Sequence, residues 1–157
     1  MINTVAKMKR ILFFSSMCLM VLIANAQKYV DLDLPSGTLW KDKNEEGGLY
    51  TYKQAVSKFG NSLPTKEQLE ELKTQCQWTW TGNGYKVVGP NGQSIYLPAA
   101  GYRFCNGNVY CVGSNGYYWS SAPRGSNDAW YLSFDSDGVY IDYYDQCDGH
   151  SVRLVQD

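Results

Sequence analysis

The sequence predicts an α+β fold because helical patterns come early in the chain and strand patterns come late. Two segments with helical periodicity and capping residues lie at 52–59 and 66–75. After residue 76 the apolar segments are short, they alternate with polar residues, and turn residues such as Asp137-Gly138 separate them. Helices followed by many short strands are typical of an α+β domain, and 157 residues is the length of one domain.

The first 26 residues are typical of a secretory signal peptide. Three positive charges within the first ten residues precede an apolar run at 11–23, and Ala24-Asn25-Ala26 is an A-x-A cleavage site. The apolar run is shorter than the roughly 20 residues of an ordinary membrane span. We therefore expect export, with residues 1–26 removed and residues 27–157 forming a single domain that is secreted or held at the cell surface.

The two helices have clear start and stop signals. Thr51 is the predicted cap of the first helix, which Gly60 ends. Thr65 caps the second helix, and Gln68 three residues later completes a capping box. The second helix is expected to end near Gln75.

The strands are predicted from polar and apolar alternation and from the turns between them. Residues 29–34 form the first strand, and the turn Pro35-Ser36-Gly37 leads to a second at 38–40. Gly89-Pro90-Asn91-Gly92 and Asp137-Gly138 are hairpin turns. The remaining predicted strands are 77–81, 85–88, 94–97, 117–121, 129–134, 139–142 and 151–155.

The composition argues against nucleic acid as a partner and favours a contact surface in the second half. The chain has 14 basic and 15 acidic residues, so it lacks the basic excess that duplex nucleic acid requires. No Glu follows Glu71 and no Lys follows Lys86, whereas Tyr, Asn, Ser, Gly and Asp are frequent there. Such side chains lose little rotamer entropy on binding. A strand-rich half whose turns need Asn, Asp and Gly would have a similar composition, so both interpretations stay open.

The last hairpin is expected to have an apolar face and a polar face, because side chains alternate across a strand. Tyr offers rigid contact area and a hydroxyl, and Asp offers a charged acceptor. The polar face is interpreted either as a binding surface or as a solvated sheet face with cross-strand Tyr pairs. The apolar face comprises Trp130, Leu132, Phe134, Val139 and Ile141. The polar face and the loop after it comprise Tyr131, Ser133, Asp135, Tyr140, Asp142, Tyr143, Tyr144, Asp145, Cys147, Asp148 and His150.

The sequence offers little for catalysis or metal binding. His150 is the single histidine, so a zinc site or a catalytic histidine is not favoured. Asp135-Ser136-Asp137-Gly138 starts like an EF-hand loop, but no Glu closes that loop. We therefore predict no enzyme, no catalytic residue, no metal and no cofactor.

The four cysteines after the signal peptide allow three full pairings. Their spacing matches no known disulfide framework, although an exported protein permits disulfides. A Cys105–Cys111 bridge requires a turn that brings the two residues together. Cys76 is expected to be a small buried apolar side chain rather than a reactive thiol.

Several motifs occur in an order that resembles a known family. They are LPSGTLW at 34–40, LPT at 63–65, WTWT at 78–81, GPNG at 89–92, LPAAGYR at 97–103, GYYWSS at 116–121 and SVRLV at 151–155. Together they resemble exported gut-bacterial proteins related to the Fibrobacter-type major paralogous domain family. The resemblance implies a C-type-lectin-like fold of the formylglycine-generating-enzyme branch, with two helices on a small, twisted, mostly antiparallel sheet. The paired reactive cysteines of formylglycine-generating enzymes have no counterpart here.

A subset of that fold serves as the variable proteins of diversity-generating retroelements. There, miscopied template adenines change AAC-type Asn codons to Tyr, Asp, Ser, Cys, His and similar residues, but not to Gln. The resemblance implies that the polar face listed above is such a variable surface, within a fixed framework of Trp119, Trp130, Leu132, Phe134 and Val152. Cysteines at such positions need not form a disulfide framework, and Gln146 is either framework or evidence against a fully variable stretch. Additional variable positions would be Phe104, Cys105, Asn106, Tyr110, Cys111, Asn127 and Asp128.

These observations predict a non-enzymatic binding module that is secreted or displayed at the cell surface. Its expected partner is a protein or glycan ligand on another cell or phage surface, with no nucleic acid and no membrane span in the mature chain. The alternatives are a structural surface component and a metal-independent glycan-binding accessory protein.

Overall fold

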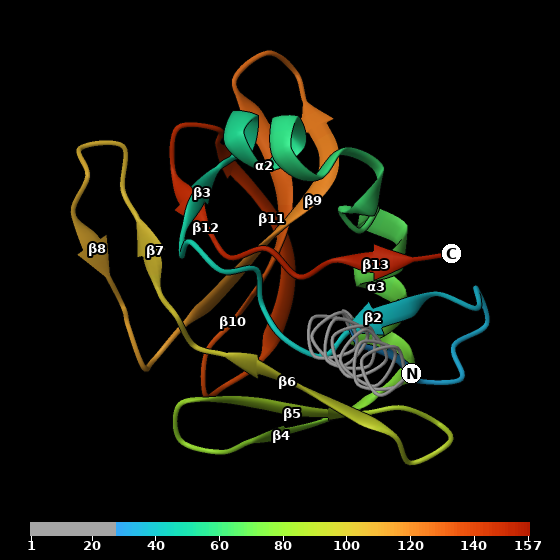
Figure 1. The fold of residues 1–157 in the computed structure, drawn as a ribbon. Coiled ribbons are helices and arrows are strands. Elements are labelled where there is room, and N and C mark those ends of the chain that lie inside the picture. The colour runs from blue at the N-terminus through green and yellow to red at the C-terminus, as the bar shows by residue number, and fades with distance from the viewer. Residues whose placement is uncertain (1–27) are drawn as a thin grey trace, which may run out of the picture.

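The computed structural model describes residues 28–157, and its ribbon shows two helices with several small antiparallel sheets (Figure 1). This confirms the α+β class. The predicted signal peptide lies outside the described residues. In the part of the chain that is described, neither helix has the length and apolar character needed to cross a membrane.

Thirteen strands, two α-helices and one 3₁₀ turn make up the described chain. The helices are α2 (Tyr52–Phe59) and α3 (Lys66–Gln75), and the 3₁₀ turn η1 (Gly60–Ser62) lies between them. The strands are β1 (Tyr29–Asp31), β2 (Leu39–Lys41), β3 (Tyr50–Thr51), β4 (Gln77–Trp80), β5 (Gly84–Val88), β6 (Ser94–Pro98), β7 (Tyr102–Arg103), β8 (Val109–Tyr110), β9 (Gly116–Arg124), β10 (Asp128–Phe134), β11 (Val139–Asp145), β12 (Gly149–His150) and β13 (Val155–Gln156).

Both helices begin at the predicted caps. The Thr51 hydroxyl accepts a hydrogen bond from the Gln54 N–H, and the Gln54 side chain accepts one from the Thr51 N–H. Thr65 and Gln68 form the predicted capping box of α3 in the same way. These reciprocal bonds satisfy two N–H groups that each helix start would otherwise leave unpaired. Gly60 ends α2, as predicted, and continues into η1.

Two predicted strands are shorter than the alternation indicated. β1 stops at Asp31 because Asp33 adopts a positive φ of 59° and its N–H bonds the Asp31 carboxylate. The segment 151–155 contributes only Val155 to a strand, because its backbone bonds several different elements. For example, the Ser151 N–H bonds a carbonyl in β9, and the Leu154 carbonyl accepts from an N–H in β2.

The central sheet has the strand order β11-β10-β9 (Figure 1). It separates two apolar cores. The hairpin turn at Asp137-Gly138 is confirmed, and Phe134 pairs with Val139 beside it. One face of the sheet buries Leu132 and Phe134 in the first core, with α3 and the β4-β5-β6 sheet. The opposite face buries Trp119 in the second core, beneath α2.

A four-stranded sheet, in the order β3-β12-β7-β8, was not predicted from the sequence. Each of its strands has only two residues, which is too short for an alternation pattern. The sheet joins segments that lie up to a hundred residues apart in the chain, since Gly149 pairs with both Thr51 and Arg103. This sheet covers part of the second face of the central sheet and so creates the site described next.

Candidate binding pocket

A pocket of about 190 Å³ lies between the central sheet and the four-stranded sheet. It is lined by Tyr102, Phe104, Tyr117, Tyr131, Tyr144, Asp148 and His150. Five of these residues were predicted as site residues, and Tyr102 and Tyr117 were not. We call this cavity the aromatic pocket. The prediction missed its concave shape because the strands that wall it, β7 and β12, have no signature in the sequence.

Tyr117 lies at the centre of the aromatic lining. Its ring centroid is 5.1 Å from that of Tyr102, 5.8 Å from that of Tyr131 and 5.4 Å from that of His150. His150 in turn stacks on Trp119 with ring centroids 3.9 Å apart. Because Tyr102, Tyr117, Tyr131 and His150 contact one another, this part of the lining is fixed by packing before any ligand binds.

The predicted alternation along the hairpin is confirmed, but the expectation that its polar face is exposed to solvent is wrong at one end. Tyr131, Asp142 and Tyr144 do share a face, since Tyr131 pairs with Asp142 across the ladder. However, Tyr131 is buried. Asp148 and His150 are also buried, and each of these two is only 1% exposed. The reason is tertiary: α2, β3 and β12 cover this end of the face, and period-two alternation does not show which face a second layer will cover.

His150 is a neutral, buried imidazole. Burial lowers the pKa of His150 to about 3, so the ring carries no charge at neutral pH. Its Nδ1 atom is buried without a hydrogen-bond partner within residues 28–157. A buried polar atom without a partner costs free energy, and Nδ1 carries that cost inside the folded protein.

Asp148 is the carboxylate of the aromatic pocket. One of its oxygens accepts a hydrogen bond from the Cys105 N–H at 3.1 Å. Burial raises the pKa of Asp148, and the nearby negative charge of Asp145 raises it further, whereas the Cys105 bond opposes both effects. Burial also raises the pKa of Tyr102, Tyr117 and Tyr131, so their hydroxyls stay protonated and able to donate.

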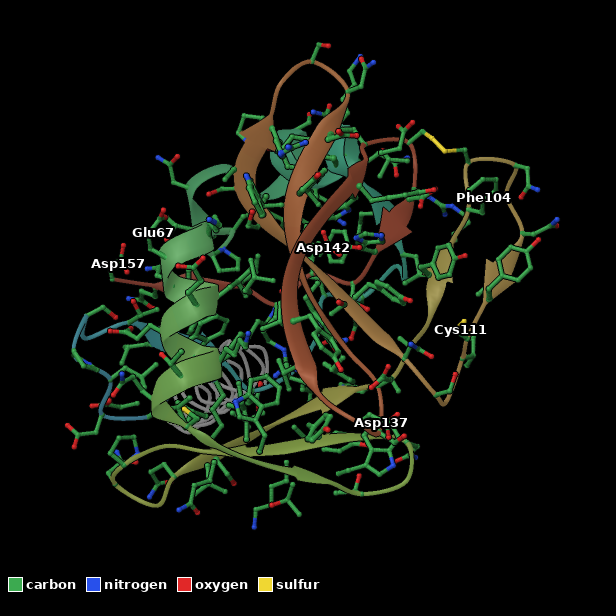
Figure 2. The ribbon with its side chains drawn as sticks, turned by 180° about the vertical axis from the view of Figure 1, so that it is seen from behind. Glu67, Phe104, Cys111, Asp137, Asp142 and Asp157 are labelled. Carbon is green, nitrogen blue, oxygen red and sulfur yellow. A yellow bond between two sulfur atoms is a disulfide. The ribbon has the colours of Figure 1, made fainter. Side chains whose placement is uncertain are left out.

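A disulfide joins Cys105 to Cys147, with the two Cα atoms 5.1 Å apart (Figure 2). It connects the loop after β7 to the turn after β11, and these two segments bear the pocket residues Phe104 and Asp148. The alternative Cys105–Cys111 bridge is therefore wrong, and Cys111 is exposed and free. Cys105 and Cys147 also cluster with Asp145, but sulfurs in a disulfide are not thiolate ligands for a metal.

The remaining free cysteine fits its predicted role. Cys76 is half-buried and packs against the first core. Burial raises the pKa of its thiol to about 11, with Glu71 adding to the effect, so little reactive thiolate forms at neutral pH.

Three exposed side chains continue from the pocket along β11, and we call them the ridge: Tyr140, Asp142 and Tyr144. Tyr140 is 47% exposed and Tyr144 is 53% exposed. Tyr144 belongs to both the ridge and the pocket lining. Figure 2 shows Asp142 in the middle of β11, away from the turn at Asp137. Pocket and ridge thus form one continuous aromatic and acidic surface.

Tyr143 lies on the opposite face from the ridge, contrary to prediction. β11 runs on to Asp145, so alternation places Tyr143 opposite Trp130, with ring centroids 5.2 Å apart. The Arg124 guanidinium stacks on the Tyr143 ring, 3.4 Å from its centroid, and the Lys66 ammonium lies over Trp130. These cation–π contacts form a separate cluster beside α3.

The other predicted site residues are dispersed around the pocket or take part in turns. Asp135 accepts the N–H groups of Asp137 and Gly138 and so closes the hairpin turn. Ser133 is half-buried between Tyr117 and Tyr140 on the neighbouring strands. The following residues lie in turns or at strand ends: Asn106 and Tyr110 in the β7–β8 hairpin, Asn127 before β10, Asp128 at its start, Asp145 at the end of β11, and Cys147 in the turn after it.

Gln146 takes part in three hydrogen bonds with the backbone of other segments. Its side chain donates to the Asp128 carbonyl, its N–H donates to the Asn127 carbonyl, and its carbonyl accepts the Tyr52 N–H. These bonds hold the turn after β11 against the starts of β10 and α2. A residue with this many backbone links is suited to stay constant.

The chain belongs to the family described as domain of unknown function DUF8237, whose sequence model matches residues 64–155. The match covers more than half of the chain and includes all seven residues that line the aromatic pocket. No curated protein and no solved structure matches the chain.

Proposed function

We propose that this protein is a non-enzymatic ligand-binding module, exported and either secreted or displayed at the cell surface. The observation that carries the proposal is the continuous surface of the aromatic pocket and the ridge. The pocket has a lining of rings packed on one another and a buried carboxylate in Asp148. The ridge adds exposed Tyr and Asp side chains that are attached to rigid strands.

The dimensions indicate how such a ligand would bind. Small-molecule pockets usually have volumes of roughly 300–1,000 Å³. The aromatic pocket, at about 190 Å³, is smaller and suits one side chain or one sugar ring of a larger ligand. The ridge would then contact the surrounding surface of a protein or glycan on another cell or phage. Asp142 and Asp148 favour ligands with positive charge or hydrogen-bond donors at the contact.

The proposal includes a C-type-lectin-like fold and a surface diversified by a retroelement. Support comes from the exposure of the ridge, since the framework residues Trp119, Leu132 and Phe134 are buried in the two cores. The candidate variable residues Tyr131, Asp148 and His150 are also buried, but they line the aromatic pocket. Substitution at Tyr131 or His150 would change the depth and polarity of the pocket, and substitution along the ridge would change its rim.

A glycan-binding accessory role is the second candidate, because the Tyr rings of the pocket and ridge offer flat faces for sugar stacking without a metal. A structural surface component is the third, and it requires no ligand at the pocket.

A binding selection with a matched tyrosine control tests the proposal. The wild-type domain is screened against a glycan array and a displayed peptide library, and the affinity of each hit is measured for the wild type, Y140A/Y144A and Y96A. Tyr96 is also an exposed tyrosine, but it lies on β6 and outside the pocket. We expect the ridge variant to lose affinity at least about tenfold while Y96A does not. Hits that the wild type and both variants bind equally, or an absence of hits from both libraries, would favour the structural role.

A further inference from the structure

A second and larger cavity, of about 560 Å³, runs along α2 and lies beside β3 and Arg103 of β7. Its volume is within the usual range for ligand pockets. Three of its lining residues are cations, Lys53, Lys58 and Arg103, and no acidic side chain lines it. We call it the cationic pocket.

Chain geometry places the cationic pocket and the aromatic pocket on opposite faces of the four-stranded sheet. Successive side chains of a strand point to opposite faces. Tyr102 and Phe104 line the aromatic pocket, whereas Arg103 between them lines the cationic one. His150 of β12 and Asp148, which precedes β12, line the aromatic pocket, and Gly149 lies between them in the chain.

Gly149 leaves room for the Arg103 side chain. Thr51, Gly149 and Arg103 form one row across β3, β12 and β7. A Cβ atom on Gly149 would lie 3.0 Å from the Arg103 Nη2 and 3.1 Å from its Cζ. The guanidinium therefore lies against the glycine, and Arg103 and Thr51 both line the cationic pocket.

The exposed face of α2 supplies the other cations. Lys53, Gln54, Ser57 and Lys58 line the pocket, and their spacing of one and four residues puts them on one side of a helix. Tyr52 and Ala55 are buried on the other side. The Lys58 ammonium lies 5.2 Å from the ring centroids of Tyr50 and Phe59 and donates a hydrogen bond to the Tyr50 hydroxyl, so these contacts hold it in place.

The three cations have no carboxylate partner in the described part of the chain. The ion pairs found there join Lys41 to Glu45, Lys66 to Glu70 and Arg124 to Asp128. Three like charges around one cavity repel each other unless an anion neutralises them. A guanidinium fork binds the oxygens of a phosphate, sulfate or carboxylate in pairs, and lysines add point charges.

We infer that the cationic pocket is a binding site for a small ligand that carries an oxyanion, with Arg103 as the forked contact and Lys53 and Lys58 as flanking charges. Ser57 and the Gln54 amide provide hydrogen-bond donors at the same rim. This site is independent of the aromatic pocket and would be occupied whether or not the aromatic pocket binds a partner.

NMR titrations with three probes test the inference: glucose 6-phosphate, galactose 6-sulfate and glucuronate. They differ in the oxyanion, so their relative affinities identify its class. We expect saturable shifts at the amides of α2 and β7 for at least one probe, weakened by added salt. R103M should lower the affinity roughly tenfold, and K53M and K58M each by about threefold.

Two controls separate a built site from general attraction to positive charge. K86M removes an exposed cation on β5, outside the pocket, and should leave the affinity unchanged. G149A keeps every charge but displaces the guanidinium, so it should weaken binding severalfold while the spectrum stays that of a folded protein. The inference is overturned if no probe gives saturable shifts, or if R103M and K86M weaken binding equally.

Discussion

The same strands form both faces of the central sheet, but different layers cover the two faces. On the face beside α3, Leu132 and Phe134 are sealed in the first core. On the other face, Trp119 is sealed in the second core, but the covering layer stops short and leaves the aromatic pocket and the ridge. The comparison teaches that one strand can face a packed core on one side and solvent on the other, because adjacent side chains meet different layers. In β11, Ile141 packs against the first core, whereas Tyr140 and Tyr144 on the other face are exposed.

We call the face of the central sheet beside α3 the sealed face. Truncation of a core side chain on this face should cause the largest loss of stability. Phe134 is 1% exposed, and its ring packs on Tyr85, Trp78 and Tyr118 and covers Gly116. F134A should lower the free energy of unfolding by about 3–5 kcal/mol. Urea unfolding monitored by tryptophan fluorescence measures the change. A loss below about 1 kcal/mol would show that this face is not a packed core.

We call the opposite face, with the aromatic pocket and the ridge, the open face. Removal of the disulfide should have the next largest effect on stability, because the disulfide restrains this face. The bridge spans 42 residues, and closing a loop of that size is worth about 2–4 kcal/mol. C105S/C147S should lose stability in that range and should also lose affinity for a pocket ligand, since Phe104 and Asp148 are no longer held together. C111S is the matched control and should change neither quantity. Equal effects of the two variants would contradict the assigned pairing.

His150 makes the open face sensitive to acid. Its pKa is about 3 in the folded chain, against an ordinary value of 6.5, so unfolded chains bind the proton more readily. The stability it contributes is complete above pH 6.5 and is lost as the pH falls from 6.5 toward 3, at up to ~1.4 kcal/mol per pH unit. Asp148, whose pKa is raised, has the opposite sign and offsets part of the loss at the acid end.

Unfolding measured from pH 7 to pH 4 in wild type and H150Q tests this expectation. The wild type should lose stability more steeply than H150Q. Parallel curves would mean that the imidazole is protonated as easily in the folded chain as in the unfolded one.

The smallest effects on stability are expected at Tyr143 and Tyr144, and here the two faces should differ in function. Y144A, on the ridge, should cost less than about 0.5 kcal/mol of stability yet reduce ligand affinity. Y143A removes the stack with Arg124, worth about 0.5–1 kcal/mol, and should leave ligand affinity intact. Thermal unfolding and ligand titration on the two single variants separate these outcomes. Equal losses of affinity would place both tyrosines in one binding surface.

Local signals predicted much of the fold. The caps at Thr51 and Thr65 and the turn at Asp137-Gly138 depend on residues within a few positions of each other, and all three are found where expected. Alternation alone also predicts that Leu132 and Phe134 lie on one face of the sheet and Tyr131 on the other.

The aromatic pocket could not be predicted in full because it depends on contacts between distant segments. Tyr102 and Tyr117 became site residues only when two-residue strands brought β7 and β12 beside the central sheet. The burial of His150 and the pairing of Cys105 with Cys147 have the same origin. The sequence named most of the lining residues, but it did not show that they enclose a cavity.

Sequencing the coding region for residues 102–150 in a growing population of host cells tests the central proposal, a diversified binding surface, most directly. We predict adenine-directed substitutions concentrated at the pocket and ridge positions 131, 140, 142, 144, 148 and 150. The framework residues Trp119, Leu132, Phe134 and Gln146 should stay constant. A uniform sequence, or substitutions spread equally over the sealed face, would contradict it.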